Sequence, residues 1–444
     1  HNYLDKKYHV QLTLGHLSTK PRRPPVHLYG NSQISSLKLI MSSKPDTGII
    51  PHNIILPLGD DREVFSFQTD TLNKLSLEFD IFPTFGSKVI GKGVALPHVF
   101  NFTNGRERRN NLVTEGTGGK CICPVFDTHL KVVGELSFEF AIVKPFQGVQ
   151  LEIGGQVETY WKSTNTVSLP GSVGDQSPST GGTNSRNISS FITSSSLSGE
   201  YIQIVVQVTR DMVAVVYSEW MLPVEGFDLS VSDVTVKQFK SLSQNCPPSI
   251  SYFRGSFKVN LEIKYPTVFE MSRYWFSDIP DINTYVDTIL QTVYDHAQGN
   301  TTNNGDGKPP SNRSVMFSSF NPAICTTLNW KQPNYAVFFN SYCGFDNKTI
   351  NYGKKRKEQG DDATHGEEIE QDKRCTSIKE AVKFAKINNL LGVIFEATLL
   401  VHVPSLITNV KQAGLILTTF GSANNDPRNI RIQERYGVDA MVID

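Results

Sequence analysis

The sequence has no excess of charge of either sign and no long apolar run. Its 444 residues carry 43 basic and 43 acidic side chains, so the formal net charge is zero. Proteins that bind nucleic acid or a membrane surface usually gather basic residues, so this balance argues against both classes of partner. No apolar run approaches the roughly 20 residues that a membrane-spanning helix needs. We therefore expect no nucleic-acid partner and no membrane partner.

Cysteine is also scarce. The six cysteines are scattered along the chain, and Cys121 and Cys123 form the only close pair. Secreted disulfide scaffolds are much denser in cysteine, so we predict free thiols and a reducing compartment. In a strand both thiols of the pair would face the same side, but no second Cys/His pair completes a zinc site. We interpret the pair as structural and expect no metal and no cofactor.

Residues 1–155 are rich in strand patterns and show no convincing long amphipathic helix. Several segments alternate apolar and polar residues, and turn signals such as Gly59-Asp-Asp lie between them. This pattern predicts an antiparallel β-sandwich. We interpret the sandwich as a scaffold because it shows no ligand site. Its clearest predicted strands are 36–41, 53–58, 74–82 and 134–143.

From residue 156 the pattern changes to strands that alternate with helices. Helical periodicity occurs at 282–297, 377–388, 406–413 and 430–436, and the strands between are near-continuous apolar stretches. This alternation, with one short strand more than eight, predicts an α/β domain, a TIM-type (β/α) barrel over residues 156–444. The predicted strands are 158–169, 201–208, 212–218, 257–264, 314–320, 335–340, 391–396, 414–420 and 438–443.

Three polar insertions interrupt the predicted barrel, at 171–199, 299–313 and 352–374. The first two are rich in small polar residues, glycine and proline, and the third is a run of charges. Few apolar residues occur in them, so they bury too little surface to offset the entropy of ordering. We expect all three to be mobile.

Three strands of the second domain carry a family resemblance. The strand Tyr201–Val208 ends in Thr209-Arg-Asp211, a second strand runs from Met212 to Glu219, and a third contains Glu262-Ile-Lys264. Their order and spacing resemble the glycerophosphodiester phosphodiesterase family. The segment Ser318-Ser-Phe-Asn-Pro322 and the closing Gly437–Asp444 are also similar to that family. The resemblance extends over residues 156–444 and implies a phosphodiesterase barrel.

Most of the chemistry of the resembled family is missing. The family has a Glu-x-Asp pair, a His-Asp and a Glu-x-Lys on these three strands. In this chain the Glu and Asp positions hold Gln203 and Val205, the His position holds Ser218, and only Glu262 and Lys264 remain. A metal-assisted phosphodiesterase needs several hard oxygen ligands around its ion and a titratable group that moves protons. A single carboxylate makes a weak metal site.

Histidine is missing at the positions that the family uses. The family opens its barrel with His-Arg-Gly, whereas the candidate first strand of this chain runs into Pro170-Gly171. From residue 151 onward only His296, His365 and His402 occur, and none follows the required strands. We interpret them as surface or helix-packing histidines. The resemblance therefore implies a degenerate phosphodiesterase, a pseudoenzyme without catalytic residues.

Two alternatives remain open. A divergent hydrolase would recruit other carboxylates at strand ends, where catalysis sits in such barrels. A sensing module would keep Glu262 and Lys264 as a contact to a phosphodiester or phosphate, although we favour an inherited pair packed in the barrel mouth. The candidate carboxylates of a divergent hydrolase are Asp211, Glu219, Glu262, Glu396 and Asp426.

The combination of domains narrows the resemblance. A sandwich ending in Val132–Phe140, then Val143-Lys-Pro-Phe146 and Tyr160–Thr164, is similar to the C-terminal part of fungal proteins with an SPX domain, ankyrin repeats and a glycerophosphodiesterase domain. Both ends of the chain look like cuts in such a larger protein. One branch of that architecture hydrolyses glycerophosphocholine. The other regulates the phosphate response by inhibiting a cyclin-dependent kinase complex and has a degenerate barrel.

The sequence departs from the hydrolytic branch at the positions that define it. The resemblance therefore implies a regulatory region of a phosphate-starvation signalling protein, with a cyclin–cyclin-dependent kinase complex as its partner. It also implies a cytoplasmic and nuclear location. The basic tetrad Lys354–Lys357 fits a nuclear localisation signal, and it also fits an ordinary charged loop because acidic residues follow it closely.

Overall fold

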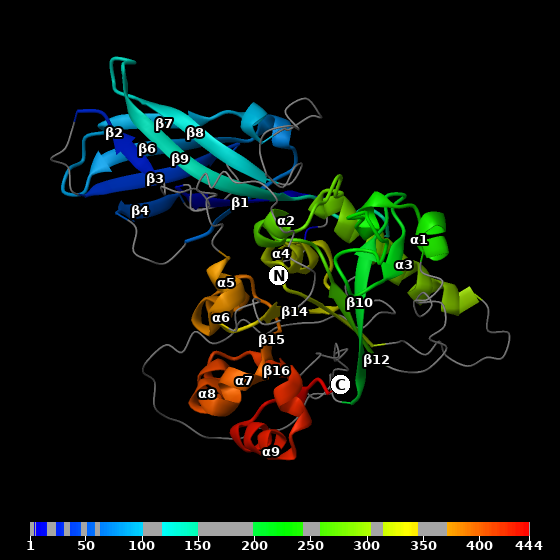
Figure 1. Cartoon of the computed structure of the whole chain (residues 1–444). Helices are drawn as coiled ribbons and strands as arrows, with labels where there is room; N and C mark the ends of the chain where they lie inside the picture. Colours follow the sequence, from blue (N-terminus) through cyan, green and yellow to red (C-terminus); the bar gives the residue numbers. More distant parts are fainter. Residues whose placement is uncertain are drawn as a thin grey trace, which may run out of the picture. The chain divides into compact units, whose positions relative to one another are not determined.

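The computed structural model describes residues 4, 6–15, 24–30, 36–45, 51–57, 63–100, 118–149, 199–242, 258–302, 314–344 and 371–443. The chain divides into two compact units, of which the first comprises Tyr3–Val149 together with Ile279–Leu290 (Figure 1). The predicted domain boundary near residue 155 and the predicted first barrel strand, 158–169, lie outside the described residues. No described helix is long and apolar enough to cross a membrane.

The first unit contains the β-sandwich that the sequence predicts. Its strands follow the order β4-β3-β6-β7-β8-β9-β1-β5, with β2 paired to β9, and every pairing is antiparallel. The strands are β1 (Tyr8–Leu14), β2 (Val26–Leu28), β3 (Leu37–Lys44), β4 (His52–Leu56), β5 (Phe65–Thr69), β6 (Ser76–Pro83), β7 (Gly91–Ala95), β8 (Gly118–Phe126) and β9 (Val132–Val143).

Strict alternation builds the sandwich core. Every second residue of β3 and β6 is buried, so Leu39, Leu77 and Phe79 face the core while their neighbours face outward. Cys121 and Cys123 both lie on the buried face of β8, with their sulfur atoms 3.5 Å apart. The prediction of free thiols is confirmed for the five cysteines that the structure describes.

The second unit contains the predicted α/β barrel. Seven strands run parallel in the order β10-β12-β13-β14-β15-β16-β17. The short surplus strand β11 pairs antiparallel with β10. The strands are β10 (Tyr201–Val208), β11 (Ala214–Val216), β12 (Lys258–Ile263), β13 (Val315–Ser319), β14 (Ala336–Ser341), β15 (Gly392–Glu396), β16 (Ile416–Phe420) and β17 (Ala440–Met441).

Helices follow the strands and surround them (Figure 1). The four predicted helices are present as α3, α6, α8 and α9, and shorter helices occur between them. The described helices are α1 (Val236–Leu242), α2 (Val268–Arg273), α3 (Ile282–Thr302), α4 (Pro322–Lys331), α5 (Lys373–Thr376), α6 (Ile378–Ile387), α7 (Ala397–His402), α8 (Ser405–Gln412) and α9 (Pro427–Tyr436).

Two predicted insertions are shorter than expected. Helix α3 continues to Thr302, so the first residues of the 299–313 segment are helical. A glycine in a helix costs only about 1 kcal/mol relative to alanine. Helix α3 therefore continues past Gly299. Helix α5 begins inside the 352–374 segment because the Asp372 side chain accepts a hydrogen bond from the Arg374 backbone at 2.9 Å and caps it.

The strand register sorts the barrel interior into layers. Parallel neighbours in register point to the same side, so Glu262 on β12, Ser318 on β13 and Phe338 on β14 share one face. An apolar layer that includes Met316 and Phe338 forms one buried cluster. On β13, Ser318 lies two residues beyond Met316 toward the carboxyl end of the strand, and its register partner on β12 is Glu262. That end of a parallel barrel is where ligand sites form.

Candidate functional site

The surviving acid, Glu262, lies in the barrel interior and is held by amide groups. Its Oε2 accepts a hydrogen bond from Gln203 Nε2 at 2.6 Å. Asn340 Nδ2 lies 3.5 Å from the same oxygen and 3.5 Å from Ser318 Oγ. Val205, the register neighbour of Glu262 on β10, offers no polar atom. The structure therefore places Gln203 and Val205, which the sequence predicts to be vestigial positions, next to Glu262.

The pKa of Glu262 responds to two opposing effects. Burial raises it, because a carboxylate loses hydration inside the barrel, whereas the Lys264 charge and the Gln203 hydrogen bond lower it. Burial dominates, and the net pKa lies above the ordinary value. Glu262 as a whole is only 8% exposed. A group in this environment carries its negative charge less readily than a solvated glutamate.

The surviving base, Lys264, is also engaged by its neighbours. Its Nζ donates a hydrogen bond to the Ser218 carbonyl oxygen. The same atom lies 4.3 Å from the centre of the Trp220 ring, which is within the range of a cation–π contact. Burial lowers the pKa of Lys264, while Glu262, Glu219 and Glu270 raise it in part.

Ser218, which the family resemblance predicts to replace a histidine, lies on an exposed turn. Its hydroxyl lies 3.4 Å from Glu219 Oε1, a weak local contact. Gln207 on β10 donates to the carbonyl oxygens of Tyr217 and Glu219, at 2.9 and 2.7 Å, and so ties this turn to the barrel. The backbone of the turn is thus well fixed, but the serine side chain is a poor proton acceptor near neutral pH.

Aromatic rings lie where β13, β14 and β16 end. Phe320 stacks on Tyr342 with ring centres 4.4 Å apart and planes 15° apart. Phe420 contacts both rings edge-on, at 5.7 and 5.8 Å. All three rings remain partly exposed. They form an apolar rim on one side of the mouth.

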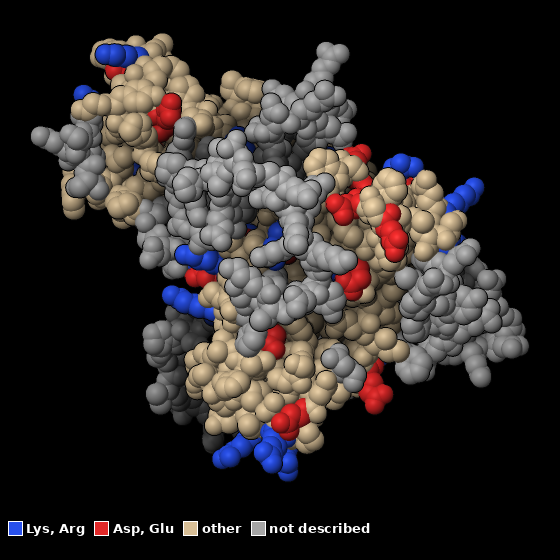
Figure 2. Space-filling view, viewed as in Figure 1, with Lys and Arg blue, Asp and Glu red and all other residues tan. Residues whose placement is uncertain are grey.

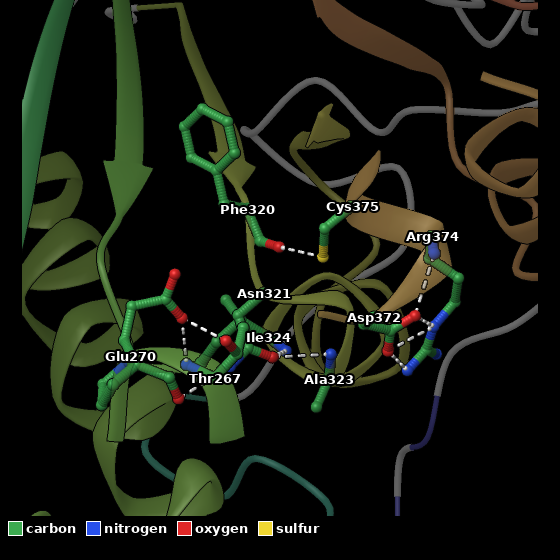
Figure 3. A network of polar contacts seen from close by, with 10 residues as sticks. Thr267, Glu270, Phe320, Asn321, Ala323, Ile324, Asp372, Arg374 and Cys375 are labelled. Carbon is green, nitrogen blue, oxygen red and sulfur yellow. Dashed lines mark hydrogen bonds and ion pairs between the residues drawn. The ribbon is translucent and has the colours of Figure 1, made fainter. Parts of the chain in front are cut away.

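The segment Ser318–Pro322, which resembles the family, has a structural role here (Figure 3). Asn321 Oδ1 accepts hydrogen bonds from the Ala323 and Ile324 backbones and caps α4. Its Nδ2 donates to the Pro266 carbonyl oxygen at 3.2 Å. Asn321 therefore joins the carboxyl ends of β12 and β13.

A second tie in the same region comes from Cys375. Its thiol donates to the Phe320 carbonyl oxygen at 3.4 Å, as Figure 3 shows. Burial raises the pKa of this thiol, which keeps it protonated and able to donate. Ser341 Oγ adds a bond to the Cys375 carbonyl oxygen at 2.7 Å. The loop at α5 is thereby attached to the ends of β13 and β14.

The described residues around Glu262 do not fit a divalent cation. Such an ion takes six or more oxygen ligands, usually with several carboxylates. Here Glu262 is the only carboxylate at the centre, and Gln203 directs an NH₂ group toward it. Asn260 and Asn340 contribute neutral amide oxygens that are buried and receive no hydrogen bond. Among the described residues no group of three His, Cys, Asp or Glu side chains could hold a metal.

The other carboxylates of the divergent-hydrolase alternative mostly serve as caps and turn anchors. Asp211 accepts from Thr209 Oγ1 at 2.7 Å and from the Val236 backbone at 2.8 Å. Glu396 caps α7 through the Thr398 backbone, and Asp426 caps α9. A carboxylate that accepts these backbone hydrogen bonds stabilises a helix start or a turn. Glu219 is exposed and lacks such a role.

Two of the three histidines that follow residue 150 lie on helices. Nδ1 of His296 on α3 lies 2.8 Å from the Thr292 carbonyl oxygen, and Nδ1 of His402 on α7 lies 2.6 Å from that of Thr398. Both side chains are exposed. His365 lies outside the described residues. The interpretation as surface histidines is confirmed for the two that the structure describes.

Sequence reasoning did not select Asn340, Asn260 or Trp220 as site residues, and it named Ser318 only as part of a family-like segment. Asn340 ends a predicted strand, two residues beyond an inward phenylalanine, and that spacing could have marked it as an inward polar group. Trp220 had no such signal. It reaches Lys264 because a turn folds back against the barrel.

Comparison with known proteins agrees with both units. A model described as GDE1-like C2 domain matches residues 4–147, and one described as Glycerophosphoryl diester phosphodiesterase family matches residues 182–444. Ankyrin repeat protein nuc-2 of Neurospora crassa is 34% identical over 97% of this chain and 41% of its own length.

Two further relatives differ in their described roles. The phosphate system positive regulatory protein PHO81 of Saccharomyces cerevisiae is 28% identical over 94% of this chain and 37% of its own length. The glycerophosphocholine phosphodiesterase GDE1 of Candida albicans is 26% identical over 100% of this chain and 43% of its own length. The chain thus spans about two-fifths of the length of these relatives. With a family model that covers more than half of it and a barrel of the expected topology, the chain belongs to the glycerophosphoryl diester phosphodiesterase family.

Proposed function

We propose that this chain is a non-catalytic regulatory region of a phosphate-starvation signalling protein that inhibits a cyclin-dependent kinase complex. The observation that carries the proposal is the environment of Glu262. Its carboxylate is hydrogen-bonded to Gln203, lies beside the Asn340 amide, and has a raised pKa. The group that should bind a metal in a hydrolase is here part of a buried amide network.

The missing groups account for a large loss of rate. General acid–base catalysis alone contributes about 10²–10⁴-fold, and a bound metal ion contributes several kcal/mol more. Ser218 replaces the acid–base group, and Gln203 and Val205 replace two metal ligands. Lys264 could help bind a phosphoryl oxygen, but it is turned toward Trp220 and the Ser218 carbonyl oxygen. No described group takes over the lost proton transfer.

One relative supports a regulatory role by its name: yeast PHO81 is described as a phosphate system positive regulatory protein. Neurospora nuc-2, at 34% identity, is named as an ankyrin repeat protein, and GDE1 of Candida albicans is named as a phosphodiesterase. The chain covers only about two-fifths of each of these proteins, so we assign it no inhibitory segment. We propose that the whole protein binds a cyclin–kinase complex and works in the cytoplasm and the nucleus.

A kinase assay with the full-length protein tests this proposal. We would measure phosphorylation of a peptide substrate by a purified phosphate-responsive cyclin–kinase complex, with increasing amounts of the protein. The wild type and the double variant Glu262→Gln, Lys264→Met should inhibit equally, since neither side chain acts chemically. Failure of the wild type to inhibit, or loss of inhibition in a variant that melts normally, would contradict the proposal.

A second candidate function is the sensing of a phosphodiester. The buried Oδ1 atoms of Asn260 and Asn340 receive no hydrogen bond, and a buried acceptor without a donor costs about 1–3 kcal/mol. A ligand with hydroxyl groups would supply donors, with Lys264 nearby for an anionic group. Calorimetry with glycerophosphocholine and with inorganic phosphate decides the question. Binding that disappears in Lys264→Ala would favour a sensor, and no binding would leave the regulatory scaffold.

A further inference from the structure

Two loops of the second unit form a surface that combines exposed aromatic rings with carboxylates. We call it the acidic aromatic face. The segments 217–230 and 274–278 together contain four acidic residues and no Lys, Arg or His. The two loops therefore carry a local excess of negative charge, although the Lys264 ammonium group contacts Ser218 and Trp220 of the first loop. The face is defined by Glu219, Glu225, Phe227, Asp228, Trp275 and Asp278.

The first loop is a small hairpin that presents Phe227 at its tip. An antiparallel bridge joins Met221 to Ser230, and the Leu222 backbone donates to the Leu229 carbonyl oxygen at 2.7 Å. The phenyl ring of Phe227 is 68% exposed. Glu225 and Asp228 flank it, are themselves exposed, and form no ion pair among the described residues.

The second loop presents Trp275. Its neighbours Tyr274 and Phe276 turn inward and pack on Trp220, with ring centres 6.3 and 5.9 Å away. This packing holds the residues on both sides of Trp275, and Trp275 itself is 66% exposed. Ser277 Oγ donates to Asp233, just beyond the hairpin, and so links the two loops. The indole is therefore displayed by a rigid support.

Exposed tryptophan and phenylalanine side chains lose the stabilisation that burial would give. Full burial of a large apolar side chain is worth about 1.5–3 kcal/mol, and aromatic residues are enriched among the residues that dominate binding interfaces. Figure 2 shows several carboxylates, with some Lys and Arg side chains beside them, over the part of the second unit that contains β10, α1 and α2. Aromatic faces and carboxylates are both complementary to cations. The chemistry of the face fits a positively charged partner.

We infer that the acidic aromatic face binds a basic segment of a protein partner. Guanidinium groups of that segment would stack on Trp275 and Phe227. The flanking carboxylates would pair with the same or neighbouring basic side chains. The inference goes beyond the proposed function and does not depend on it, because the face binds its partner whether or not the barrel is catalytic.

Binding of a defined basic probe tests the inference. We would titrate the protein into a fluorescein-labelled peptide of nine arginines and measure anisotropy at several salt concentrations. Wild-type binding should weaken steeply with added sodium chloride. Trp275→Ala should raise the dissociation constant about 5- to 10-fold, as expected for loss of one cation–π anchor. The double variant Glu225→Gln, Asp228→Asn should have a similar effect.

Matched controls make the test specific. Phe85 of the first unit is fully exposed, so Phe85→Ala removes an exposed phenyl ring elsewhere and should leave the affinity unchanged. A peptide of nine glutamates should not bind. Equal affinity of the wild type and both face variants would overturn the inference. Competition by millimolar choline would also overturn it, since that result would assign the aromatic rings to a small cation. The readout is binding alone, so its failure would leave the kinase assay unaffected.

Discussion

The carboxyl group of Glu262 is buried among amide groups in the barrel interior. In the barrel interior it costs hydration, and it recovers part of that cost through the Gln203 amide and the charge of Lys264. An uncharged glutamine could make similar hydrogen bonds. At the residue scale, the carboxylate therefore acts as a hydrogen-bond acceptor within a buried network. Its negative charge lowers the stability of the folded protein.

The destabilising effect of the Glu262 charge can be measured through the pH dependence of stability. Because burial raises the pKa of Glu262, the folded protein binds the proton more tightly than the unfolded chain. This contribution to the free energy of unfolding is present below the ordinary glutamate pKa and is lost as the pH rises through the folded-state pKa. Glu262→Gln removes the titration. We expect the melting temperature of Glu262→Gln to rise relative to the wild type between pH 4 and pH 7.

Scanning calorimetry at several pH values checks this expectation. The exposed carboxylate Glu225 supplies the control, since Glu225→Gln makes the same substitution at a solvent-exposed position. A melting temperature of Glu262→Gln that falls relative to the wild type as the pH rises would mean that the carboxylate is stabilised by a charge partner. That result would count against the amide-network account.

At the scale of elements, Asn321 connects a helix start to a neighbouring strand end. Its Oδ1 caps α4, and its Nδ2 donates a hydrogen bond to the Pro266 carbonyl oxygen. Loss of an N-cap costs about 0.5–2 kcal/mol, and a buried carbonyl without its donor adds more. We expect Asn321→Ala to lower stability by about 2–3 kcal/mol. Thermal melting measures the loss, because each kcal/mol lowers the melting temperature by about 2–4 °C in a domain of this size.

A serine at the same position separates the two roles. Serine is a good N-cap but is too short to reach across to Pro266. Asn321→Ser should therefore lose less stability than Asn321→Ala. If both variants melted together, the capping bonds of Asn321 would contribute nothing measurable.

The interior face of β15 requires glycine at position 392. A Cβ atom there would lie 2.5 Å from the Phe338 ring and 2.3 Å from the Ile416 carbonyl oxygen. Overpacking of this kind typically costs about 1–3 kcal/mol, and the backbone contact places Gly392→Ala at or above the upper end. Gly93 on β7 is a matched strand glycine with its nearest atom 3.7 Å away. Urea unfolding should show a large loss for Gly392→Ala and almost none for Gly93→Ala.

At the scale of the whole molecule, the sequence was sufficient to predict the architecture. Alternation in segments such as 74–82 and 134–143 predicted the sandwich, and β6 and β9 confirm it. Apolar runs followed by helical patterns predicted the barrel, including the extra strand that became β11. Such patterns survive in sequence because burial acts on every strand residue.

The details of the site could not be predicted in the same way. Asn340 meets Glu262 only because β12, β13 and β14 pair in one register, which fixes the depth of each side chain. Trp220 meets Lys264 because a turn after β11 folds back on the barrel. Both contacts join residues far apart in the chain, and no local period marks them. The family resemblance directed attention to Gln203, Val205 and Ser218, but it did not predict the contacts that these residues make.

Hydrolysis of glycerophosphocholine tests the central claim most directly. The purified chain would be incubated with the substrate and with either magnesium or calcium, and released glycerol 3-phosphate would be measured against a buffer control. Without the acid–base group and the metal ligands, we predict no turnover above background, and no difference between the wild type and Glu262→Ala. Turnover by the wild type that is abolished in Glu262→Ala would show a working metal site and contradict the account.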